Sequence, residues 1–298
     1  MRNVVILLSS LFILLLTACG DSNSKQNEDN RSNETEEQSD ELTGQGEEDI
    51  TDEDSSDDKA DEPNVNEGNQ IPEEDIEAQY RVSENWSLVP IEEGTNENVV
   101  LLTIDDAPEK YALEMAKTLK ELDAGAIFFV NGHFIDTPEE AEVLKEIHNM
   151  GFLIGNHTYS HVNLKTLEND LEKQREEIVG LNDVIEDIIG ERPKFFRAPH
   201  GVNTDFSRKI AEEEKMVLMN WSYGYDYFTP YMNKDKLVEA MVSGEGPEVD
   251  VPYSLLKPGA NLLMHDREWT NAALKDIITG LREEGYEILD PRLLETIQ

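Results

Sequence analysis

Cysteine is almost absent from this chain of 298 residues, because Cys19 is the only one. A fold held together by internal disulfides, as in many small secreted domains, is therefore excluded. Basic residues are also scarce: 25 Lys and Arg stand against 65 Asp and Glu, for a formal net charge of -40. No basic face is visible that could neutralise phosphate groups, which argues against nucleic acid as a partner.

A long hydrophobic run is also missing at the N-terminus, where the apolar run of residues 4–16 is too short to cross a bilayer. The run follows Arg2 and precedes Leu16-Thr-Ala-Cys19, a pattern typical of a secretory signal peptide that ends in a bacterial lipobox. In such signals the cysteine becomes the N-terminus and carries lipid. We therefore expect residues 1–19 to be a lipoprotein signal and Cys19 to anchor the protein at the extracellular face of the cell membrane; a plain cleaved signal is the alternative.

Aromatic residues are missing from the segment that follows, up to Tyr80, and β-branched residues are few there. Residues 21–96 contain 26 acidic and 4 basic residues, a net charge of -22. Such a segment cannot bury enough apolar surface to offset the loss of chain entropy on folding. We expect residues 20–92 to be a disordered, self-repelling acidic linker and residues 93–298 to form one folded domain.

The predicted domain contains seven short apolar runs that have the character of buried parallel strands. They are residues 99–104, 126–130, 152–155, 194–196, 216–219, 261–264 and 286–289. Helical patterns separate most of them, at residues 110–122, 138–150, 164–189, 204–214, 235–242 and 270–284. This alternation predicts an α/β fold with a parallel sheet, either a (β/α) barrel or a doubly wound open sheet.

Polar residues able to do chemistry follow the ends of these runs. They are Asp105, Asp106, Asn131, His157, His161, Arg197, Trp221, Asp226, His265 and Asp290. In a (β/α) barrel the carboxyl ends of the strands form the active-site face. We therefore expect these residues to converge there although they are far apart in the sequence.

Two histidines four residues apart, His157 and His161, form half of a predicted metal site. Four residues make about one helical turn, so both imidazoles would share a face if the chain becomes helical after Asn156. Asp105 and Asp106 would be costly after a buried strand unless a cation lies near them. Two exposed histidines at a helix start are the alternative. A non-haem iron site also uses two histidines and one carboxylate, but its usual spacing is absent.

Five segments in order resemble the motifs of the polysaccharide deacetylases, the NodB-homology family also called carbohydrate esterase family 4. The segments are Thr103-Ile-Asp-Asp-Ala-Pro108, His157-Thr-Tyr-Ser-His161, Phe196-Arg-Ala-Pro-His-Gly201, Trp221-Ser-Tyr-Gly-Tyr-Asp-Tyr227 and Leu263-Met-His265. The Gly-x-Ser-x-Gly elbow of a serine hydrolase is not present.

The resemblance implies a distorted (β/α) barrel of about seven parallel strands that removes N-acetyl groups from a polysaccharide. The expected partner is an N-acetylated glycan of the peptidoglycan or poly-N-acetylglucosamine type, and the expected state is a monomer. Asp106, His157 and His161 would hold a divalent metal, with zinc as the first choice and cobalt or nickel as the others.

The resemblance also assigns the other residues of the site. Asp105 would be the general base, oriented by a forked contact with Arg197, and His265 would be the general acid, held by Asp226. The oxyanion and substrate contacts would come from Pro199, His200, Trp221, Tyr227 and Leu263.

Three departures from the family pattern bear on activity. Ala107 replaces a common glycine, Ala198 and His200 replace proline and tyrosine, and Tyr227 replaces tryptophan. A glycine permits a positive φ or a close approach of ligand to backbone, and the methyl group of Ala107 would hinder either. A weakly active or inactive glycan-binding lipoprotein of the same fold is therefore the alternative function.

Overall fold

The computed structural model describes residues 76–249 and 256–298. The expected signal peptide, Cys19 and the expected linker up to residue 75 lie outside the described residues. Within the described ranges, no helix combines the length and hydrophobicity that a membrane span requires.

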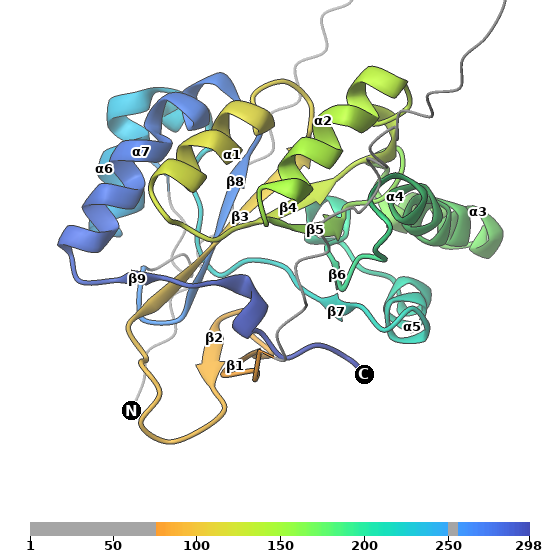
Figure 1. The fold of residues 1–298 in the computed structure, drawn as a ribbon, viewed down its shortest axis with the longest axis horizontal. Helices are drawn as coiled ribbons and strands as arrows, with labels where there is room; N and C mark the ends of the chain where they lie inside the picture. Colours follow the sequence, from red (N-terminus) through yellow and green to blue (C-terminus); the bar gives the residue numbers. More distant parts are fainter. Residues whose placement is uncertain (1–75, 250–255) are drawn as a thin grey trace, which may run out of the picture. The chain divides into compact units, whose positions relative to one another are not determined.

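Seven strands form a parallel sheet that curls into a partial barrel (Figure 1). Their order in the sheet is β7-β6-β5-β4-β3-β8, and β9 pairs with the start of β3. The strands are β3 (Val99–Ala107), β4 (Ile127–Val130), β5 (Leu153–Asn156), β6 (Phe195–Phe196), β7 (Val217–Leu218), β8 (Ala260–His265) and β9 (Glu287–Ile288). Each lies at a predicted run, so the barrel prediction is confirmed, and the doubly wound alternative is not the fold adopted.

The helices lie in an arc around the outside of the sheet (Figure 1). They are α1 (Ala112–Glu121), α2 (Pro138–Asn149), α3 (Leu171–Arg175), α4 (Leu181–Ile189), α5 (Asp205–Glu213), α6 (Lys234–Ser243) and α7 (Glu268–Glu283). Helices α6, α7, α1, α2 and α4 contact one another in that order. This order places α7, which follows β8, next to α1, which follows β3.

The prediction of one helix over residues 164–189 is wrong. The segment divides into a 3-10 turn (Leu164–Leu167), α3, a π-helical turn (Glu176–Gly180) and α4. Asn163 begins the 3-10 turn and Asp170 separates it from α3, because the side chain of each accepts a hydrogen bond from a backbone N–H two or three residues later and so begins a new turn.

An antiparallel hairpin of β1 (Tyr80–Val82) and β2 (Leu88–Pro90) lies in the segment expected to be linker. Tyr80 and Leu88 are buried in one cluster with Val99 and Leu101 of β3. The expected boundary at residue 92 is therefore wrong, since the folded domain already includes residue 80. The prediction followed the acidic composition of the segment and did not consider Tyr80 and Leu88, whose apolar side chains pack the hairpin against the domain.

The hairpin marks the amino ends of the barrel strands. The N–H of Leu88 donates to the carbonyl of Gly259, just before β8, and the N–H of Gly259 donates to the carbonyl of Val99 at the start of β3. The N-terminal part of the described chain therefore enters at the end of the sheet opposite the carboxyl ends of the strands.

Side chains alternate along β3, all of whose residues are buried. Val100, Leu102 and Ile104 belong to the large cluster that includes the helices, whereas Val99 and Leu101 belong to the cluster with β4, β6 and β7 residues. Burying one such leucine fully contributes roughly 1.5–3 kcal/mol. The same alternation puts Thr103 and Asp105 on the face of Val99 and Leu101, toward the barrel interior.

Candidate active site

Asp105 and Asp106 lie at the carboxyl end of β3, where the strand departs from regular geometry. Asp106 has a φ of 59°, and the register between β3 and β4 shifts between Ile104 and Ala107. Neighbouring side chains of a regular strand point to opposite faces, but this irregularity brings both carboxylates close to one histidine. The Nε2 atom of His157 lies 3.6 Å from Asp105 Oδ2 and 3.8 Å from Asp106 Oδ1.

The loop that carries His157 and His161 is not helical, which corrects the predicted helical turn. Thr158 and His161 have φ values of 67° and 55°, which a right-handed helix cannot contain. The two rings still meet, with their centroids 5.0 Å apart. The buried amide of Asn131 holds this loop, because its Nδ2 donates to the carbonyls of His157 (2.7 Å) and Thr158 (3.0 Å).

Glu177 supports the same loop from the π-helical turn. Its buried carboxylate accepts hydrogen bonds from the backbone N–H and the hydroxyl of Ser160, both at 2.8 Å, and its carbonyl accepts from the N–H of Tyr159. The sequence reasoning missed Glu177. The buried face of this helical segment also contains Gln174 and Asn182, so an isolated carboxylate on an apolar face was not the signal, and π-helical turns are frequent at functional sites.

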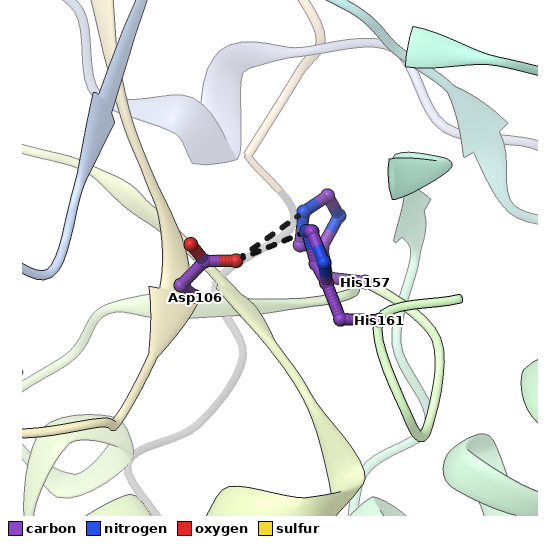
Figure 2. A group of neighbouring side chains, drawn as sticks. All are labelled: Asp106, His157 and His161. Carbon is purple, nitrogen blue, oxygen red and sulfur yellow. Dashed lines mark ion pairs between the residues drawn. The ribbon is translucent and has the colours of Figure 1, made fainter. Parts of the chain in front are cut away.

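The side chains of Asp106, His157 and His161 converge on one point (Figure 2), with their ligand atoms all within 4.8 Å of one another. Asp106 Oδ1 lies 3.3 Å from His161 Nε2. His157 Nδ1 must carry a proton, because it donates to the carbonyl of Arg197 at 2.7 Å, and the neutral ring therefore keeps a lone pair on Nε2.

The electrostatics of these three residues suit a cation. Burial lowers the pKa of His157 to about 3 against the opposing effect of Asp106, and burial also lowers the pKa of His161. Both imidazoles are therefore neutral at pH 7. Asp106 Oδ1 is buried and has no hydrogen-bond partner. A buried carboxylate oxygen that lacks a hydrogen-bond partner and lies beside two neutral imidazoles is unfavourable without a cation, so the residues fit a divalent metal.

Arg197 lies fully buried beside Asp105. Its Nη1 donates to Asp105 Oδ1 at 2.6 Å and to Thr103 Oγ1 at 2.8 Å. The expected forked contact is wrong, because Nε and Nη2 are used by the carbonyls of Met219 and Asn220. Burial raises the pKa of Asp105. The charge of Arg197 acts in the opposite direction but does not cancel this effect, so the pKa of Asp105 is raised overall.

His265, which is partly buried, forms a second pair with the fully buried Asp226. His265 Nδ1 lies 2.8 Å from Asp226 Oδ1, and the backbone N–H of His265 donates to Asp226 Oδ2 at 2.6 Å. The hydroxyl of Thr270 donates to the same Oδ2. Burial alone would lower the pKa of His265, but the charge and hydrogen bond of Asp226, together with Asp105 and Asp106, raise it to about 9. His265 is therefore a cationic proton donor at pH 7.

The remaining predicted contacts border these two pairs. His200, in the turn Pro199–Gly201, has a φ of 59° and its ring lies 5.0 Å from that of His161. The ring of Tyr227 lies 5.9 Å from that of His265 and 6.3 Å from that of Trp221. Leu263 is buried on β8, two residues before His265.

One predicted strand-end residue does not join the site. The carboxylate of Asp290 binds Arg292, and β9 pairs only with Val99 and Val100 at the start of β3.

Comparisons with known proteins agree with this geometry. A family model described as polysaccharide deacetylase matches residues 92–219. A peptidoglycan-N-acetylglucosamine deacetylase of Bacillus cereus is 32% identical over 200 residues, which cover 65% of this chain and 69% of the relative. The chain belongs to the polysaccharide deacetylase family.

Two more similarities connect this chain to other members of the family. The peptidoglycan-N-acetylmuramic acid deacetylase PdaA of Bacillus subtilis is 28% identical over 195 residues, covering 64% of this chain and 69% of that protein. The solved structure of a wild-type pseudoenzyme of carbohydrate esterase family 4 from Bacillus anthracis is 30% identical. It has a TM-score of 0.56 and covers 64% of this chain and 63% of that one. The deacetylase fold is thus shared with solved structures of the family.

Ala107 does not occupy a conformation that requires glycine. The positive φ falls on Asp106 instead, and Ala107 is the last residue of β3, paired with Val130 after the register shift. Its methyl group is fully buried in the large hydrophobic cluster. The backbone strain considered for an alanine at this position is therefore not found.

Arg267 is the second residue that the sequence reasoning missed. Its Nη2 lies 2.6 Å from Asp106 Oδ2, and its Nη1 binds Glu109. Arg267 follows His265 by two residues, outside all five motifs, and no local pattern pairs it with an aspartate at position 106.

Proposed function

We propose that this protein is a metal-dependent N-deacetylase that hydrolyses acetamido groups of a cell-wall glycan, of the peptidoglycan or poly-N-acetylglucosamine type. The observation that carries the proposal is that two proton-transfer pairs, Asp105 with Arg197 and His265 with Asp226, border the site of Asp106, His157 and His161. The peptidoglycan deacetylases among the relatives support the choice of substrate.

Asp106, His157 and His161 would hold the metal, and zinc suits two imidazoles and one carboxylate. When bound there, such an ion acts as a Lewis acid that activates water and polarises the amide carbonyl.

Asp105 is the proposed general base. It takes a proton from the water that attacks the acetyl carbon, and its raised pKa brings its basicity closer to the working pH. Arg197 fixes the orientation of this carboxylate through Oδ1 and leaves Oδ2 on the side of His157. Because Arg197 is bound by two carbonyls and Thr103 as well, the base cannot rotate freely.

His265 is the proposed general acid. An amide nitrogen leaves only after protonation, and the pKa of about 9 keeps His265 charged at neutral pH. Asp226 accepts from both Nδ1 and the backbone N–H of His265, which fixes the ring with Nε2 free to donate. One proton is taken by Asp105 and one is given by His265, so the overall hydrolysis is balanced.

The remaining contacts have substrate roles in this proposal. The backbone N–H at His200, after Pro199, stabilises the developing oxyanion. Tyr227 borders the acid, Trp221 offers a face for a sugar ring, and Leu263 lines the space for the acetyl methyl group.

The proposed location is the outer face of the cell membrane, with lipid on Cys19 and residues 20–75 as an acidic tether. The lipobox supports the anchor. The tether would join the domain at the β1–β2 hairpin, at the amino ends of the strands, while the site lies at their carboxyl ends.

An inactive glycan-binding protein is the second candidate, because a solved relative is a pseudoenzyme. Two observations favour the enzyme. All the residues proposed for metal binding and proton transfer are present in one site, and Ala107 packs without a positive φ.

The test is acetate release from N-acetylglucosamine oligomers and from peptidoglycan, with the full chain stripped of metal and then refilled with zinc or cobalt. Release that depends on metal supports the deacetylase. A protein that binds one zinc per chain, retains the glycan and releases no acetate would support the binding protein instead. Asp105→Asn is the inactive control.

A further inference from the structure

Each of the two adjacent aspartates at the end of β3 has its own arginine. Arg197 binds Asp105, and Arg267 binds Asp106, both at 2.6 Å. Arg197 lies inside a family motif, whereas Arg267 does not. The pair of Asp106 and Arg267 therefore needs a separate explanation.

The two oxygens of Asp106 have different neighbours. Oδ2 accepts the hydrogen bond of Arg267, while Oδ1 lies toward His157 and His161 and has no hydrogen-bond partner. A carboxylate that rotates freely offers both oxygens to a cation. A guanidinium on Oδ2 fixes this rotation and leaves only Oδ1 for the ion.

The position of Arg267 is set by contacts between the end of β8 and the loop after β3. The N–H of Asp266 donates to the carbonyl of Asp105 at 3.0 Å. The carboxylate of Asp266 accepts from the N–H groups of Lys110 (2.8 Å) and Tyr111 (2.5 Å) at the start of α1. Asp266, the residue before Arg267, thus joins the two segments through both its backbone and its side chain, and Glu109 binds the other nitrogen of Arg267.

The burial of the pair also distinguishes it from an ordinary surface ion pair. The side chain of Asp106 is 11% exposed and that of Arg267 is 32% exposed. Exposed ion pairs contribute little because solvent screens them and both side chains lose freedom. Here one partner is buried and already fixed by its backbone conformation.

We propose that Arg267 is a positioning residue that holds Asp106 as a metal ligand through Oδ1 alone. The inference rests on the metal centre of the proposed function and deepens it, since it assigns a residue that sets how the ion is held. Supporting residues around metal ligands typically change metal affinity by about 10–100-fold when they are replaced.

The test compares the full chain with Arg267→Met, Arg267→Lys and the control Arg175→Met. Arg175 pairs with Glu213 at the same 2.6 Å, but on the exposed surface. Zinc affinity is measured by competition with a chelator, and the cobalt-loaded proteins are compared by visible absorption. We expect Arg267→Met to bind zinc about 10-fold or more weakly. We also expect weaker cobalt bands, because a second oxygen of Asp106 raises the coordination number.

Arg267→Lys should recover part of both properties, because an ammonium group can still bind Oδ2, and Arg175→Met should match the wild type. Unchanged or tighter zinc binding by Arg267→Met would overturn the proposal. Weaker binding with an unchanged cobalt spectrum and no recovery by lysine would also overturn it, since the role would then be structural. Zinc binding by the wild type is measured first. A wild-type chain that binds no zinc would refute the proposed metal centre, and with it the proposed function, independently of the role of Arg267.

Discussion

The pKa of His265 provides the sharpest test of the acid assignment. Its value of about 9 exceeds the ordinary 6.5 chiefly because of Asp226, since burial acts in the opposite direction. The difference corresponds to on the order of 3 kcal/mol, because one pKa unit equals about 1.4 kcal/mol. In Asp226→Asn the charge is lost while the burial remains. We therefore expect the pKa of His265 to fall below 6.5.

Two measurements check this expectation. NMR titration of the imidazole in metal-free protein should give a pKa near 9 for the wild type and below 6.5 for Asp226→Asn. In acetate-release assays the variant should lose most of its activity at pH 7 and work best at lower pH, because the general acid must be protonated. An unchanged pKa of His265 in the variant would refute the reasoning.

The same pair gives a dependence of stability on pH. The folded-state pKa of His265 is raised, so its stabilising effect is fully present below pH 6.5 and is lost as the pH rises through about 9. The gap in unfolding free energy between the wild type and Asp226→Asn should therefore narrow between pH 6.5 and 9. Urea unfolding with a chelator present measures this gap, and a gap that does not vary with pH would contradict the assignment.

Three further predictions concern the base, the metal ligands and the domain boundary. Asp105→Asn should lower acetate release by about 10²–10⁴-fold while zinc stays bound, and near-full activity would remove the base assignment. His157→Ala should lose zinc and activity together. Metal analysis of the purified variants checks this, because Asp105→Asn should retain its zinc. Deleting residues 21–75 should leave activity on a soluble glycan unchanged, whereas deleting residues 21–92 should lower the melting temperature, because it removes Tyr80 and Leu88 from their cluster.

The barrel was predictable because most of its strands are short, apolar and buried on both faces, and because helical patterns separate most of them. β3 is the clearest example, since all nine of its residues are buried and its run Val99-Val-Leu-Leu-Thr-Ile104 is visible in the sequence. A parallel sheet also fixes where the strand ends meet. That rule alone predicted that Asp105, His157, Arg197 and His265 would converge, before any contact between them was known.

The sequence was less informative wherever a feature depends on contacts between distant segments. The loop from His157 to His161 has the spacing of a helix, but its shape depends on hydrogen bonds that Asn131 donates to it and Glu177 accepts from it. The hairpin at Tyr80 looks like linker by composition because its contacts with β3 are not local. Arg267 and Asp106 are 161 residues apart, and one sequence carries no sign of such a pair.

The positions of the base and the acid explain why the site needs two supporting partners. Asp105 and His265 are register partners on the adjacent strands β3 and β8. Neighbouring strands lie about 4.8 Å apart, so an anionic carboxylate and a cationic imidazole at these positions would otherwise tend to pair with each other. Arg197 binds Asp105 at Oδ1 and Asp226 binds His265 at Nδ1, and each contact satisfies its partner from the side away from the reaction. Oδ2 of Asp105 and Nε2 of His265 therefore remain available. The two opposite charges stay separate on neighbouring strands, so Asp105 can accept a proton while His265 donates one.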